Sequence, residues 1–101
     1  MPESTRKEVY QGLLRAMGHY KPVWVDNTST GESIHATDEG ALKQAVTWVV
    51  EGDDVCILTH HVWGVGGGAT SRFTGTRWKH RYVRWNGDGW DVDTQQKVHH
   101  G

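Results

Sequence analysis

The chain has 101 residues, of which 36% are hydrophobic, and 11 Lys+Arg balance 12 Asp+Glu. This length fits one domain covering residues 1–101, because domains commonly run to roughly 100–150 residues. No apolar run approaches the roughly 20 residues of a membrane span, the amino terminus lacks the apolar core of a secretory signal, and a lone Cys56 excludes an internal disulfide framework. These features predict a soluble, cytoplasmic protein.

The first predicted element is an amphipathic helix that begins near Thr5 and ends before Gly18. Thr5 and Glu8 have the spacing of a capping box, in which each side chain bonds the other residue's backbone N–H. Apolar residues recur at helical spacing, at Val9, Leu13, Ala16 and Tyr20. Gly18 suits a left-handed helix end, and Pro22 prevents continuation. Gly12 costs the helix about 1 kcal/mol relative to Ala, which indicates that another group packs close to it.

Two short strands and a second helix follow. Residues 22–26 predict a strand with Pro22 at its first position, where no hydrogen-bond donor is missed. A polar turn over residues 27–31 leads into a second strand over residues 32–36. Thr37 or Asp38 caps the second helix and Gly52 ends it. Its apolar stripe consists of Leu42, Ala45, Val46 and Val49.

The last part of the chain predicts three strands, over residues 54–63, 76–85 and 90–97. The first of these has apolar residues at both odd and even positions, which is typical of a central strand. A glycine-rich loop over residues 64–71 follows it. Residues 86–89, Asn-Gly-Asp-Gly, are a strong hairpin signal because they tolerate positive φ. We expect a loose tail from about residue 98.

The predicted order is therefore α-β-β-α-β-β-β, and the predicted fold class is α+β. Two one-sided helices need a sheet face to cover, so we expect a two-layer domain with both helices on a mostly antiparallel sheet of about five strands. The short connections predict that the last three strands form an antiparallel meander. The position of the third strand relative to the first two stays open.

Tryptophan provides the leading functional hypothesis. The chain holds six, more than a domain of this size encloses completely. We expect an exposed aromatic surface on the C-terminal meander that either joins two copies in a homodimer or lines a cleft for a small organic or cationic ligand. The residues of this predicted surface are Trp63, Trp78, Tyr82, Trp85, Trp90 and Arg84.

A nucleic-acid-binding module is the alternative. Residues 1–54 hold 5 basic and 9 acidic residues, whereas residues 55–101 hold 6 and 3. The strand over residues 76–85 alternates cations with aromatic rings that could stack on bases: Arg77, Trp78, Lys79, Arg81, Tyr82 and Arg84. If Trp85 pairs with Trp90, however, Arg84 faces Asp91 and Tyr82 faces Asp93, so the next strand neutralises part of this basic surface.

The remaining candidates are weaker. A metal-dependent enzyme would need His61 or His60 with His80, but adjacent residues of a strand face opposite ways, so His60 and His61 cannot share an ion. The glycine loop is a candidate anion or partner loop through Gly66, Gly67, Gly68 and Arg72. Cys56 has the apolar surroundings of an inert thiol. The sequence predicts no cofactor and no catalytic residue, and it favours a binding protein over an enzyme.

Overall fold

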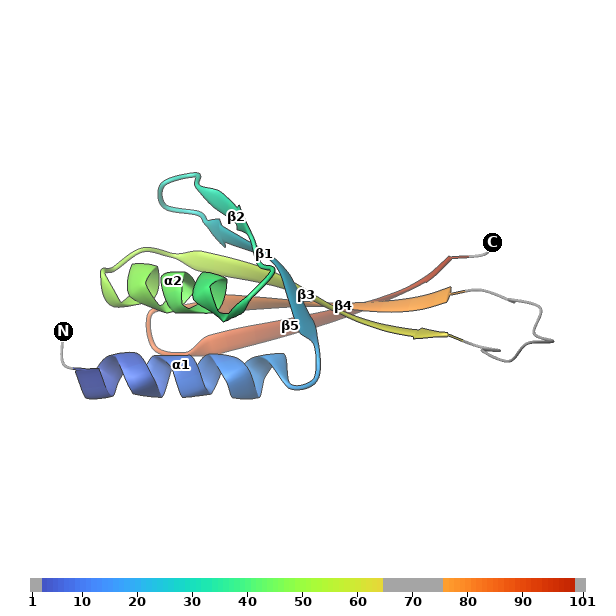
Figure 1. The fold of residues 1–101 in the computed structure, drawn as a ribbon, viewed down its shortest axis with the longest axis horizontal. Helices are drawn as coiled ribbons and strands as arrows, with labels where there is room; N and C mark the ends of the chain where they lie inside the picture. Colours follow the sequence, from blue (N-terminus) through green and yellow to red (C-terminus); the bar gives the residue numbers. More distant parts are fainter. Residues whose placement is uncertain (1–2, 65–75, 100–101) are drawn as a thin grey trace.

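A computed structural model describes the backbone of residues 3–64 and 76–99 and the side chains of residues 5–61 and 79–94. It has the predicted α+β fold, in which two helices pack on a five-stranded antiparallel sheet (Figure 1). The elements are α1 (Glu3–Met17), β1 (Lys21–Asn27), β2 (Ser33–His35), α2 (Glu39–Val50), β3 (Val55–Gly64), β4 (Thr76–Trp85) and β5 (Trp90–His99).

The strand order is β2-β1-β3-β4-β5, with every neighbouring pair antiparallel. This order confirms the predicted meander and the central position of β3. The position of β3 relative to β1 and β2 was left open by the sequence. In the structure, α2 connects β2 to the other side of β1, so that β3 pairs with β1 rather than with β2. The helix needs this crossover, since its apolar stripe must reach the face that α1 also covers.

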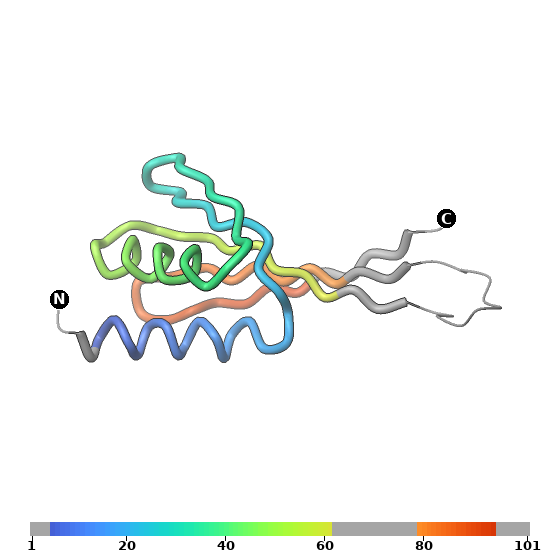
Figure 2. Tube along the Cα trace, in the orientation of Figure 1, coloured from blue at the N-terminus to red at the C-terminus, as the bar shows by residue number. Residues whose placement is uncertain are grey.

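The core lies between the helices and one face of the sheet. Val25, Ile57 and Val83 occupy paired positions on β1, β3 and β4, and all three side chains are fully buried. Leu13 of α1 and the predicted stripe of α2 close the other side of this core. The second face of the sheet carries no helix among the described residues (Figure 2).

The predicted capping box of α1 is wrong. The helix already includes Glu3, so Thr5 and Glu8 lie within its first turns rather than at its start. An acidic residue at position 3 favours this earlier start because it faces the positive end of the helix dipole. The prediction for Gly12 is confirmed, since a Cβ there would lie 3.4 Å from Cδ1 of Trp90.

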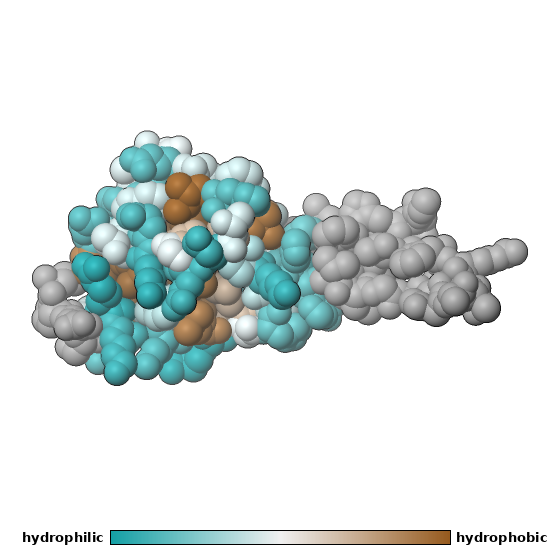
Figure 3. All heavy atoms as spheres, in the orientation of Figure 1, coloured by the Kyte–Doolittle hydropathy of each residue, from teal (hydrophilic) through white to brown (hydrophobic). Residues whose placement is uncertain are grey.

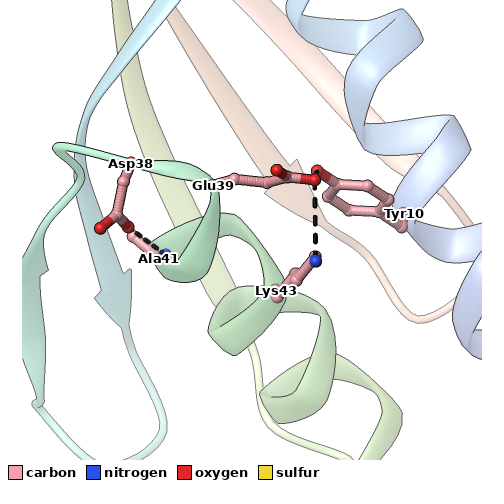
Figure 4. A network of polar contacts seen from close by, with 5 residues as sticks. All are labelled: Tyr10, Asp38, Glu39, Ala41 and Lys43. Atoms are coloured by element: carbon pink, nitrogen blue, oxygen red, sulfur yellow. Dashed lines mark hydrogen bonds and ion pairs between the residues drawn. The ribbon is translucent and has the colours of Figure 1, made fainter.

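Asp38 is the cap of α2, with its Oδ1 accepting a hydrogen bond from the Ala41 N–H at 3.3 Å (Figure 4). The first turn of this helix also binds α1. The Tyr10 hydroxyl donates to Oε1 of Glu39 at 3.0 Å, and Lys43 lies 3.7 Å from the same oxygen. Burial and the bond to the Glu39 carboxylate both raise the pKa of Tyr10.

Most strand ends differ from the prediction by one or two residues, and two of these differences have a structural reason. Pro22 is the second residue of β1, and the pairing with β3 shifts between Pro22 and Trp24, so the irregularity accommodates a residue without an N–H. At the other end of the chain, β5 continues to His99 instead of ending at residue 97. Val98 and His99, predicted to belong to a loose tail, pair with Arg77 and Thr76.

Two asparagines build the turns. Asn27 is 1% exposed, and its Oδ1 accepts hydrogen bonds from the Ser29 and Thr30 N–H groups in the predicted turn after β1. Asn86 uses the same chemistry in the predicted β4–β5 hairpin, where its Oδ1 accepts from the N–H groups of Asp88 and Gly89 at 2.8 Å. Such side chains replace missing backbone partners in tight turns.

Neither described helix is long and apolar enough to cross a membrane. On the face seen in Figure 3, polar side chains cover most of the described surface and apolar ones reach it in small separate groups. Among the residues whose side chains the structure describes, the exposed large apolar ones are Leu14, Trp24 and Val92.

Candidate functional site

Three strands continue past the helices as a narrow extension of the sheet (Figure 1). We call this part the ribbon; it consists of residues 60–64 of β3, 76–80 of β4 and 95–99 of β5, which stay in register to the Gly64–Thr76 and Thr76–His99 pairs. The ribbon makes the molecule elongated, with principal extents of 55 × 25 × 21 Å. The remainder of the described chain, with both helices, is called the body.

The ribbon carries charge of one sign. The chain has no Asp or Glu in residues 55–87 or 94–101, so the charged residues of the ribbon are Arg77, Lys79 and Lys97, together with four histidines. All three acidic residues of the C-terminal half, Asp88, Asp91 and Asp93, lie in or next to the β4–β5 hairpin of the body. The count of charged residues in each half of the sequence therefore understates how far the acidic and basic residues are separated in the structure.

Arg81 stands where the body meets the ribbon, and its guanidinium is used internally. Its Nη1 donates to the carbonyls of Ala16 and Met17 at 3.0 and 3.2 Å, at the end of α1 where carbonyls lack partners within the helix. The Met17 carbonyl also accepts from the Tyr20 N–H at 3.0 Å. Its Nε donates to Oγ1 of Thr94 at 3.3 Å, and the group lies 4.0 Å from the ring centre of Tyr20. Arg81 was a predicted nucleic-acid contact, but these bonds assign it to the junction.

The histidines separate as expected from strand alternation. His61 lies on the helix side, with its ring 4.5 Å from that of His19 and its backbone paired with Lys79. His80 pairs with His60 on the opposite face, so the combination of His61 with His80 cannot form one site. Burial, followed by the charges of His19 and Lys79, lowers the pKa of His61.

No metal site emerges from this arrangement. Within the part of the chain that the structure describes, no group of three or more His, Cys, Asp and Glu side chains could hold a metal ion. The metal hypothesis therefore has no geometric support among those residues.

The predicted aromatic surface is divided between the two faces of the sheet. Trp85 and Trp90 lie on the helix side, half-buried against the core, with their ring centres 5.2 Å apart in an edge-to-face arrangement. Nε1 of Trp90 donates to the Val9 carbonyl at 3.0 Å, so this ring is held under α1. Tyr82 and Arg84 occupy the alternate positions of β4 and face the other way.

The open face holds a smaller group of side chains. Trp24 and His35 are in ring contact at 5.0 Å on β1 and β2, and Trp24 is 42% exposed. Cys56 lies next to Arg84 on this face. Burial raises the pKa of the Cys56 thiol and Arg84 offsets part of that rise, which is opposite to the shift that a nucleophilic cysteine needs.

The predicted pairing of β4 with β5 is confirmed, since Trp85 faces Trp90, Arg84 faces Asp91 and Tyr82 faces Asp93. Trp63 and Trp78 are ribbon positions on β3 and β4, but their side chains lie outside the described set. The candidate anion loop, with Gly66, Gly67, Gly68 and Arg72, also lies outside the described residues.

A cleft of about 850 Å³ lies at the end of the body away from the ribbon, between α1, the α2–β3 turn and the β4–β5 hairpin. Trp85 and Trp90 line it, together with Glu8, Asp88 and Arg15. The small organic or cationic ligand stays a prediction, and this cleft combines the indole rings of Trp85 and Trp90 with the carboxylates of Glu8 and Asp88.

Sequence reasoning missed two features of the functional surface, namely the ribbon and the uncovered outer edge of β5. The stretches without acidic residues were visible in the sequence, but only the strand register shows that they lie side by side.

Comparison with known proteins found no match among protein-family models, curated proteins or solved structures.

Proposed function

We propose that this chain is a non-enzymatic binding protein whose ribbon binds the phosphate backbone of nucleic acid. The observation that carries this proposal is the charge of the ribbon, where Arg77, Lys79 and Lys97 are accompanied by no acidic residue. Cations that neutralise phosphates supply most of the affinity in sequence-independent binding. The proposal keeps Arg77 and Lys79 from the predicted basic strand and adds Lys97 from the next strand.

The acidic residues of the body are too distant to cancel this charge. Asp93 is the acidic residue of β5 nearest the ribbon, and the positions of Lys79, Lys97 and Arg77 lie three, four and five residues further along the strands. At about 3.4 Å per residue these separations are about 10, 14 and 17 Å, each longer than the screening length of about 8 Å at physiological salt. A polyanion at the ribbon therefore experiences a cationic surface although the whole chain has a formal net charge of −1.

Shape supports the same partner. Two-stranded β-ribbons enter the major groove of DNA, which is about 12 Å wide, and neighbouring strands about 4.8 Å apart allow two strands of the ribbon to fit within that width. The ribbon extends beyond both helices, so a long partner can approach it without contacting the body (Figure 1).

Fluorescence anisotropy with a labelled DNA duplex and a single strand of equal length tests the proposal. We expect binding that weakens steeply with salt, with a log–log slope that falls by about 0.9 for each phosphate contact removed. The double variant Arg77→Glu/Lys79→Glu should bind about tenfold more weakly or worse, with a slope smaller by about 2.

The control is Lys7→Glu/Lys43→Glu, which changes the net charge equally but on the exposed faces of α1 and α2. Its affinity should stay close to that of the original protein. Absence of binding to both probes, or an equal loss in both variants, contradicts a nucleic-acid function of the ribbon.

Self-association through the C-terminal meander is the second candidate function, and a different observation favours it. The paired residues of β5 form a ten-residue strand at the outer edge of the sheet. Exposed backbone groups on such an edge readily pair with another chain.

A further inference from the structure

The two edges of the sheet are very different. β2 forms one edge and has three residues, whereas β5 forms the other and has ten. β5 contains neither Pro nor Gly, and its register with β4 runs from Trp90 to His99 without a shift. Proteins normally protect a long regular edge with a proline, a bulge, a covering loop or a partner, and charged residues are the only such device in β5.

The helix layer leaves part of β5 uncovered. Val92 faces Val83 across the β4–β5 pair, on the side of the sheet that carries the helices. Val83 is fully buried, but Val92 is 45% exposed, and Thr94 beyond it is exposed as well. α1, which runs alongside β5 in Figure 1, therefore leaves the side chains of Val92 and Thr94 accessible, so another element can approach this edge.

The hairpin determines which backbone groups point outward. The Asn86 N–H donates to the Gly89 carbonyl at 3.0 Å, so the next pair, Trp85 and Trp90, is a non-hydrogen-bonded pair. Alternate residues of β5 from that point direct their N–H and C=O groups away from β4. The outward residues are Trp90, Val92, Thr94, Gln96 and Val98.

We infer that β5 pairs with β5 of a second copy of this chain, antiparallel, about a two-fold axis at Thr94. This register pairs all the outward residues, since Trp90 faces the partner's Val98, Val92 faces the partner's Gln96 and Thr94 faces the partner's Thr94. Such an interface uses the same patch on both copies and extends the sheet across the dimer.

Charge selects this register. An axis at Val92 brings Asp91 opposite the partner's Asp93, and an axis at Asp93 brings the two copies of that residue together. The axis at Thr94 instead places Asp91 opposite the partner's Lys97, and symmetry forms this pair twice. An axis at Gln95 also places Asp93 opposite the partner's Lys97, but Trp90 then faces a position beyond His99, so fewer of the described outward residues are paired.

The shape of the molecule accommodates this pairing. α1 ends over Arg81, beside Thr94, so it flanks only the first half of β5. In the antiparallel arrangement, the body of each copy lies beside the partner's ribbon, and the two α1 helices are displaced along the strands. The pairing leaves Arg77 and Lys79 on β4 outside the interface and engages Lys97, so a dimer would bind phosphate through the two β4 cations and not through Lys97.

Size-exclusion chromatography with light scattering, without nucleic acid, tests the inference. At micromolar concentration we expect twice the monomer mass of 11.4 kDa. Asp91→Lys and Lys97→Asp should each shift the protein to monomer, because like charges then face each other twice. The double variant Asp91→Lys/Lys97→Asp should restore the dimer, which a general loss of folding could not do.

A second pair of variants tests the backbone hydrogen bonds between the two β5 strands. Gln96→Pro removes an outward N–H and should give a monomer with an unchanged circular dichroism spectrum, whereas Gln96→Ala keeps the N–H and should remain dimeric. A monomeric original protein overturns the inference, as does a dimer that tolerates both single charge variants and Gln96→Pro. Rescue of Lys97→Asp by Asp93→Lys instead of Asp91→Lys overturns the register.

Discussion

Arg81 is the side chain with the most varied contacts in the described structure. It binds two carbonyls at the end of α1, the Thr94 hydroxyl of β5 and the ring of Tyr20. A guanidinium suits this position because its fixed, planar set of donors can serve several acceptors at once, whereas a lysine ammonium acts as a compact point charge. The residue thereby ties the helix layer to the sheet.

Replacement of Arg81 should therefore destabilise the protein. Arg81→Ala leaves the last carbonyls of α1 without this donor, and hydrogen bonds of charged groups are worth about 1.5–3 kcal/mol each before solvent screening. Since Arg81 is partly exposed, we expect a loss of about 2 kcal/mol in the free energy of unfolding, with Arg81→Lys in between. Arg84→Ala, on the open face, should cost about 0.5 kcal/mol or less in the same urea titration.

His61 should make stability depend on pH. The pKa of His61 in the folded protein lies below its ordinary value of 6.5, because burial and the nearby His19, Lys79 and His60 disfavour its charged form. The unfolded chain therefore takes up the proton more readily, so stability is highest above pH 6.5 and falls as the pH drops from there through the folded pKa.

Thermal unfolding between pH 8 and 5, on either side of about 6.5, measures this effect. His61→Gln should flatten the dependence of Tm on pH, because the substituted residue does not titrate. His35→Gln, the same change on the exposed edge strand β2, should leave the slope close to the original. An identical pH slope in the original protein and His61→Gln would contradict the assignment.

At the scale of elements, α1 and the β4–β5 hairpin are fitted to each other around one glycine. Trp90 packs against Gly12 and donates to the carbonyl of Val9, so the indole ring occupies the space that a larger residue at position 12 would need. The ring satisfies its N–H through this bond while remaining partly buried.

Substitutions at Gly12 should therefore have opposite effects according to size. Gly12→Ala places its Cβ at 3.4 Å from Trp90, an ordinary contact, and should stabilise the helix by about 0.5–1 kcal/mol. Gly12→Leu should displace the ring, break its bond to Val9 and lower Tm, with a change in tryptophan fluorescence. Stabilisation by Leu as well would show that the contact is unimportant.

The elements could be predicted because their signals are local. Helical spacing in α1 and α2, the Asn-Gly-Asp-Gly turn and the alternation along β4 each depend on neighbours in sequence, and the structure has all of them. The predicted start of α1 was wrong because it relied on the capping-box spacing of Thr5 and Glu8, whereas the helix already includes Glu3. The end of β5 was wrong because pairing with β4, rather than the propensity of Val98 and His99, extends it.

The candidate site was less predictable because it depends on long-range placement. Four tryptophans of the meander looked like one surface, but Trp85 and Trp90 turn inward under α1. Arg81 looked like a surface cation until α1 supplied its acceptors. No pattern within one strand specifies where the helix layer ends, so neither the ribbon nor the open edge of β5 could be inferred.

The whole molecule has an acidic body and a cationic ribbon joined along one continuous meander. A formal net charge of −1 conceals this polarity. Both proposals depend on this separation of charge. In the first, phosphates would bind the cationic ribbon; in the second, the partner's Lys97 would lie opposite Asp91 on β5. They predict different effects of salt, since counterion release governs nucleic-acid binding whereas backbone hydrogen bonds continue to hold the paired strands.

The short length of β2 limits the number of copies that can join through the edges of the sheet. When two copies join through β5, the strands left at the outside are the two β2 segments, each with three residues. So few backbone groups offer no template for a further strand, and the irregular pairing of β1 beside them interrupts the regular ladder. A dimer joined through β5 should therefore be a closed pair that adds no further copies along the sheet.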